Sequence, residues 1–164
     1  MTIVNVRAAE ERDLDRLLEV FDRVVAEKRW VYAEPGYDRN AYKKRWLGYV
    51  RAEIPGMLAI VEVNGTIAGS IDTQRHPEYG WVLGMFVDAS ARGCGAGQAL
   101  IAAAIDWTRA RGAERLSLLV FPHNERAIKL YDRNGFVRED YYERDVTRKT
   151  GEVWDTMLMV KRLN

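Results

Sequence analysis

The sequence has 164 residues, of which 48% are hydrophobic and 30% are charged, and its formal net charge at pH 7 is +1. This composition indicates one globular domain over residues 1–164 in the cytoplasm, and it excludes a strongly basic nucleic-acid binder. No stretch reaches the ~18–20 apolar residues of a membrane helix, so no membrane partner is expected. One cysteine and two separated histidines exclude an internal disulfide and argue against a metal site.

The first half of the chain predicts a strand, two helices and a hairpin, over residues 2–7, 14–25, 39–52 and 57–74. Asp13 is a candidate N-cap for the first helix, and Pro35-Gly36 is a turn signal between the two helices. Asn64-Gly65 lies between two β-rich runs, which is the strongest short signal for a hairpin.

The second half predicts a strand, a helix, a strand, a helix and a final antiparallel strand pair, over residues 81–88, 98–111, 115–121, 124–134, 136–145 and 153–163. Gly84, inside the first of these strands, indicates a bulge or a bend. The run 115–121 is almost continuously apolar, as a buried parallel strand is. The order of elements predicts an α/β fold around one mixed sheet.

Three glycines separate the strand 81–88 from the following helix, at positions 93, 95 and 97. The first backbone N–H groups of a helix have no partner inside it, and together with the helix dipole they favour an anion such as phosphate. Glycines let the anion approach closely, and Arg92 adds a charged donor. A simple tight turn is the alternative explanation.

Two other phosphate loops do not fit this stretch. A P-loop requires Lys and a hydroxyl residue after its last glycine, but Gln98 follows Gly97. A dinucleotide-binding fingerprint spaces its glycines as G-x-G-x-x-G at the start of a βαβ unit, and here they run G-x-G-x-G.

The run "VDASARGCGAGQALI" resembles the coenzyme A loop of the GNAT superfamily of N-acetyltransferases, whose signature [QR]-x-x-G-x-[GA] is matched by residues 92–97. The later run "FPHNERAIKLYDRNGFVRE" is similar to a second motif of that family. It has an Asn, an Ala three residues on, a Tyr seven residues on, and then Gly135-Phe136. The order of the predicted elements resembles the family over most of the chain.

The resemblance implies a single GNAT domain, with a mostly antiparallel sheet whose middle strands splay apart to admit acetyl-coenzyme A. The loop amides would hold the pyrophosphate, the strand before the loop would bind the pantetheine arm, and the second motif would complete the site. The implied cofactor-binding residues are Met85, Phe86, Val87, Arg92, Gly93, Cys94, Gly95, Ala96, Gly97, Gln98, Asn124, Ala127 and Tyr131.

Acetyl transfer to an amine requires a neutral amine, a stabilised oxyanion and a proton for the departing thiolate. The resemblance implies that Tyr131 donates that proton, although a structural tyrosine is the alternative. Many family members carry a base, a Glu, on the central strand, but that position is Trp81 here. Glu78 is the catalytic carboxylate we select, with His76 and Asp72 as further candidates. The alternatives are that all three are solvated loop or strand-end residues and that a water chain relays the proton. Cys94 occupies a variable position of the loop, so a catalytic thiol is not expected.

The acceptor is expected opposite coenzyme A, where Trp30 and Tyr32 would frame it and Glu34 would hold its ammonium group. These aromatic residues could equally close the core. The sequence is also similar to the family branch that acetylates small amines and amino acids. We therefore expect an enzyme that acetylates a small primary amine. Acetylation of protein N-termini or lysines, and an acyl-coenzyme A sensor without turnover, are the alternatives, and a homodimer is left open.

Overall fold

The computed structural model describes all residues, 1–164. Four α-helices and seven β-strands follow one another along the chain, with two short 3-10 turns at Glu11–Asp13 and Ala89–Ala91. They are β1 (Val4–Ala8), α1 (Leu14–Ala26), α2 (Arg39–Val50), β2 (Gly56–Val63), β3 (Thr66–His76), β4 (Gly80–Val87), α3 (Ala96–Ala110), β5 (Arg115–Val120), α4 (Glu125–Arg133), β6 (Val137–Thr147) and β7 (Val153–Arg162).

The seven strands form one sheet in the order β1-β2-β3-β4-β5-β7-β6. Every neighbouring pair is antiparallel except β4 and β5, which are parallel. The structure therefore confirms the predicted α/β class with a mostly antiparallel mixed sheet.

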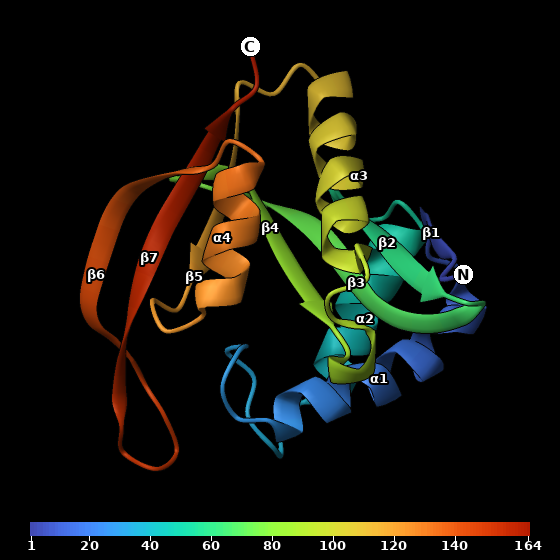
Figure 1. The fold of residues 1–164 in the computed structure, drawn as a ribbon, viewed down its shortest axis with the longest axis horizontal. Helices are drawn as coiled ribbons and strands as arrows, with labels where there is room; N and C mark the ends of the chain where they lie inside the picture. Colours follow the sequence, from blue (N-terminus) through green and yellow to red (C-terminus); the bar gives the residue numbers. More distant parts are fainter.

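The middle of the sheet is split. Strands β4 and β5 pair only at Trp81–Leu116 and Val82–Ser117, and they then diverge, as Figure 1 shows. Strand β4 still pairs with β3 as far as Val87, so from Leu83 onward only its β5-facing edge has no strand partner. This free edge is one boundary of the site described below.

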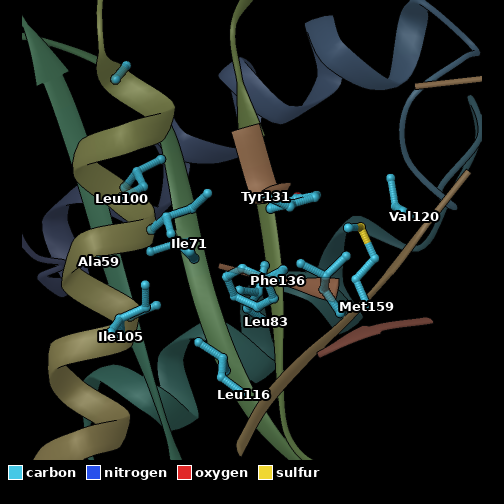
Figure 2. Packing of buried hydrophobic residues seen from close by; sticks show 14 of the residues in the cluster. Ala59, Ile71, Leu83, Leu100, Ile105, Leu116, Val120, Tyr131, Phe136 and Met159 are labelled. Carbon is cyan, nitrogen blue, oxygen red and sulfur yellow. The ribbon is translucent and has the colours of Figure 1, made fainter. Parts of the chain in front are cut away.

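Helices cover both faces of the sheet and form two hydrophobic cores. Helices α1 and α2 pack on one face around Leu17, Trp46 and Ile60. On the other face α3 and α4 pack against the sheet, and Figure 2 shows Leu100 and Ile105 of α3 beside Ile71. Because Leu100 is fully buried, its replacement by Ala should cost about 2–5 kcal/mol.

Two local expectations are corrected by the structure. Gly84 pairs in regular register with Asp72 of β3 and makes no bulge there, so the bulge prediction was wrong for this edge. Asp13 stands at the predicted N-cap of α1 but makes no cap bond in that helix. Its carboxylate instead accepts from the Arg7 guanidinium at 2.8 and 2.9 Å and from the Glu10 N–H at 2.8 Å. In contrast, the predicted hairpin turn is confirmed, with both Asn64 and Gly65 at positive φ.

Candidate active site

A cleft of about 940 Å³ lies where β4 and β5 part. One wall comes from β4, the loop 91–98 and α4. The other wall comes from α1, the segment between α1 and α2, and α2. Two distant parts of the sequence thus meet across the split in the sheet.

The loop at the start of α3 presents unpaired backbone donors to this cleft. The N–H groups of residues 93 to 98 donate to no backbone acceptor, and the first bond of α3 is made only by Ala99 to the Gly95 carbonyl. Gly93 and Gly95 have φ of +81° and +91°, and a Cβ at either would meet nothing within 4 Å. Open space in front of free amides at a helix N-terminus suits a bulky anion such as a diphosphate.

Arg92 plays a different part from the one expected. Its guanidinium nitrogens donate to both carboxylate oxygens of Glu27 at 2.8 and 2.6 Å, and Nε donates to the Val87 carbonyl at 3.1 Å. The Arg92 side chain therefore ties the start of the loop to the end of α1, while still lining the cleft.

Helix α4 is held close to the loop by small and polar residues. A Cβ on Gly97 would lie 2.9 Å from the Leu130 Cδ2 atom, so any larger residue would require the Leu130 side chain to move. Gln98 and Asn134 exchange two side-chain hydrogen bonds at 2.8 and 2.9 Å. Helix α4 also contributes three basic side chains to the cleft, which add to its attraction for an anion: Arg126, Lys129 and Arg133.

The two polar residues of the second motif both line the cleft. The Asn124 side chain accepts from the Ala127 N–H at 3.3 Å, so it caps α4. Tyr131 is 6% exposed, and burial raises the pKa of its phenol above the ordinary value. The phenol is therefore neutral at physiological pH and retains a proton to donate.

Most of the residues expected to bind a cofactor lie together on this wall. Eleven of them line the cleft, namely Met85, Phe86, Val87, Arg92, Gly93, Gly95, Gly97, Gln98, Asn124, Ala127 and Tyr131. The side chains of Cys94 and Ala96 do not. The Cys94 Sγ donates to the Ala91 carbonyl at 2.9 Å, and Ala96 is buried in the core.

The expected acceptor residues are divided by the structure. Trp30 and Tyr32 line the cleft, and Tyr32 is 45% exposed. Glu34 does not line it, because its carboxylate accepts from the Lys149 N–H at 3.1 Å and lies 3.7 Å from Arg148 Nε. Arg148 is 4% exposed and donates to the Val31 and Tyr32 carbonyls, so it fastens the α1–α2 segment to the β6–β7 hairpin.

Asp72 lines the cleft, as does Glu125 at the start of α4, whereas Glu78 does not. Glu78 is exposed in the turn between β3 and β4 and does not line the cleft. Asp72 does line it, and burial raises the pKa of its carboxyl to about 6. Trp81 lies T-shaped against Trp107 with ring centres 4.9 Å apart, as a packing residue does.

Sequence reasoning missed Arg45 altogether and ranked Asp72 below Glu78. Arg45 lies on α2 between two aromatic residues of the cleft, Tyr42 and Trp46. The signal available for Asp72 was its position in β3 opposite Gly84, but this register is known only once the strands are paired.

The structure thus combines a mixed sheet that splits in its middle with a cleft whose free backbone donors suit an anionic ligand. A family model described as the acetyltransferase (GNAT) family matches residues 17–136, and the chain therefore belongs to the GNAT family of acetyl-CoA-dependent acetyltransferases. An uncharacterized N-acetyltransferase of Methanocaldococcus jannaschii is 30% identical over 150 residues, which cover 82% of this chain and 61% of that protein.

Two further similarities extend over the whole length. YwnH of Bacillus subtilis, a candidate phosphinothricin acetyltransferase by its name, is 24% identical over 98% of this chain and 100% of its own. The crystal structure of a GNAT-family acetyltransferase from Streptococcus pneumoniae is 25% identical, with a TM-score of 0.84 over 98% of this chain and 99% of that one. None of the four helices is long and apolar enough to cross a membrane, and no group of three or more metal-ligating residues is present.

Proposed function

We propose that the protein transfers the acetyl group of acetyl-CoA to a primary amine of a small molecule, by direct attack within a ternary complex. The single observation that carries this proposal is the run of unpaired amides from residue 93 to 98, next to the free edge of β4. Together they offer a cradle for a diphosphate and a backbone edge for an amide-containing arm.

The residues present fit acetyl-CoA. The open space at Gly93 and Gly95 would admit the diphosphate, and the basic side chains of α4 would face its negative charge. The free edge of β4 at residues 83–87 would bind the peptide-like groups of the pantetheine arm, as an added strand would. When bound, acetyl-CoA supplies an acetyl group already activated as a thioester.

Tyr131 would supply the proton that the leaving sulfur requires. Its phenol lies in the wall formed by α4. Burial alone raises its pKa, and no neighbouring group forms a hydrogen bond that shifts it. A buried, neutral phenol holds its proton until a stronger base forms beside it. The structural alternative is weakened because the hydroxyl serves no partner in the protein.

Support for a small acceptor comes from the opposite wall. Trp30, Tyr32 and Tyr42 line the cleft. Arg148 of the β6–β7 hairpin binds the carbonyls of Val31 and Tyr32 and so holds this segment against the hairpin. A concave site lined by aromatic side chains favours a small amine over a protein chain. The name of YwnH also points to a small-molecule acceptor for that protein.

Calorimetry and a turnover assay test the proposal separately. We expect acetyl-CoA to bind the purified protein, and a panel of amines and amino acids to release thiol from acetyl-CoA. Binding without turnover of any panel member would shift the assignment to protein substrates or to a sensor. Absence of binding at saturating concentration would overturn the cradle itself.

A further inference from the structure

Asp72 is a carboxylate that the fold leaves without a partner. It takes part in none of the ion pairs of the protein. Burial raises the pKa of its carboxyl, and the charge of Arg45 lowers it. No hydrogen bond contributes to this shift. Asp72 is partly exposed and lines the cleft, so its unpaired carboxylate is available to a ligand there.

Gly84 keeps this carboxylate accessible. The two residues are cross-strand partners in β3 and β4, and a Cβ at Gly84 would lie 3.3 Å from Asp72 Oδ1. A larger side chain would therefore cover Asp72 from the direction of β4. Both residues line the cleft, so the position that lacks a side chain exposes the carboxylate beside the free edge of β4.

Arg45 is the matching unpaired cation. Its guanidinium lies over the Tyr42 ring at 4.7 Å from the ring centre, and its Nε is buried without a hydrogen-bond partner. Arg45 also lines the cleft and is close enough to influence the ionisation of Asp72, yet the two side chains form no ion pair. Opposite charges held apart in one cleft leave a site for a ligand that carries both.

We infer that Asp72 and Arg45 form the acceptor subsite, in which Asp72 takes a proton from the ammonium group and Arg45 binds an anionic group on the same molecule. The acceptor class is thus a zwitterionic amine, of which an amino acid with an apolar side chain is the simplest member. The aromatic residues Trp30, Tyr32 and Tyr42 would contact that side chain. This inference rests on the proposed acetyl transfer and narrows its substrate.

The proton and electron balance of the step is complete without an added reagent. The ammonium loses two protons, of which Asp72 accepts one and passes it to solvent, while the other ends on sulfur. The nitrogen lone pair forms the new N–C bond, and the electron pair of the broken C–S bond goes to sulfur. An amide, a thiol and one released proton result.

The charges around Asp72 set the pH range in which it can act. From α2, Arg45 lowers and burial raises the pKa of Asp72, and Tyr49 of the same helix also faces it. Its strand neighbours Leu58 on β2 and Gly84 on β4 carry no charge. With a pKa of about 6, the carboxylate is ionised at neutral pH, and kcat/KM should fall as the pH drops below about 6.

Paired probes and variants test this subsite. L-phenylalanine and L-phenylalaninamide differ only in the anionic group, so Arg45→Gln should raise KM about 10–100-fold for the acid and leave the amide nearly unchanged. Lys44→Gln, an exposed neighbour outside the cleft, is the matched control. Asp72→Asn should lower kcat about 10²–10⁴-fold and remove the acidic limb of the pH profile. Gly84→Ala should lower kcat/KM for both probes, because the added methyl group would lie against the Asp72 carboxylate without removing it.

Two results would overturn the subsite while leaving the proposed function in place. One is turnover of plain amines with no preference for the acid probe. The other is an unchanged acid-to-amide ratio in Arg45→Gln. A readout independent of turnover is calorimetric binding of both probes to the protein saturated with coenzyme A. If no amine is ever acetylated, the proposed function fails. Tighter calorimetric binding of the acid than of the amide, lost in Arg45→Gln, would still support the subsite.

Discussion

The two ends of the cleft are built by different means. The cofactor end is made chiefly of backbone, from the amides of residues 93 to 98 and the free edge of β4. The acceptor end is made of side chains that come from α1, α2, β3 and the segment between the two helices. Backbone donors require glycines and a fixed spacing, whereas a side-chain pocket requires only that distant segments meet. The first end therefore leaves a motif in the sequence and the second does not.

The largest expected effect breaks the backbone end. Gly95→Asp would place a negative charge in the open space before the free amides, and acetyl-CoA binding should disappear from calorimetry. Gly112→Asp is the control, because Gly112 also has a positive φ and an unobstructed Cβ direction but lies outside the cleft. Both variants carry a similar backbone strain, so normal binding by Gly95→Asp would remove the loop from the site.

The next effect concerns the wall between the two ends. Tyr131→Phe removes one hydroxyl from a buried ring, so turnover should fall about 10²–10⁴-fold while acetyl-CoA affinity stays nearly constant. Steady-state kinetics with calorimetry measures both quantities. Tyr141→Phe, whose hydroxyl bonds Asp155 outside the cleft, should keep full turnover. Equal activity in the two variants would assign Tyr131 to packing alone.

A smaller effect sharpens the account of the acceptor end. Arg148→Ala would leave the Val31 and Tyr32 carbonyls and the Glu34 carboxylate without their cation. We expect a loss of about 2–3 kcal/mol in the free energy of unfolding and a raised KM for the acceptor, with acetyl-CoA affinity unchanged. Lys149→Ala, at an exposed neighbouring position, should change stability far less. Denaturant titration and kinetics would detect the opposite outcome, in which cofactor affinity falls instead.

The smallest effect is a gain in stability at the proposed base. Because the folded-state pKa of Asp72 is about 6, above the ordinary 3.8, its contribution to stability is present below pH ~4 and lost as the pH rises through 6. Asp72→Asn should therefore raise the free energy of unfolding by about 1–2 kcal/mol at pH 8 and change it little at pH 4. Denaturant titrations at both pH values measure this. Destabilisation at both would show that Asp72 has a structural bond.

The fold was predictable because each element carries a local signal. Helical spacing marked α1, Asn64-Gly65 marked the β2–β3 hairpin, and the glycines marked the start of α3. The side-chain pairings were not predictable. Arg92 binds Glu27, which is 65 positions earlier, and Glu34 binds the Lys149 amide, 115 positions later. The choice between Glu78 and Asp72 likewise depends on strand register, which residue types do not specify.

The divergence of β4 from β5 has a consequence for how the molecule responds to its ligand. Only two residue pairs join the β1–β4 part of the sheet to the β5–β7 part, so the central ladder is incomplete in the free protein. A ligand arm that pairs with the free edge of β4 would act as an eighth strand and connect the two parts of the sheet. The midpoint temperature of thermal denaturation should then rise with acetyl-CoA concentration, following mass action. Hydrogen exchange should slow most at the amides of residues 83–87.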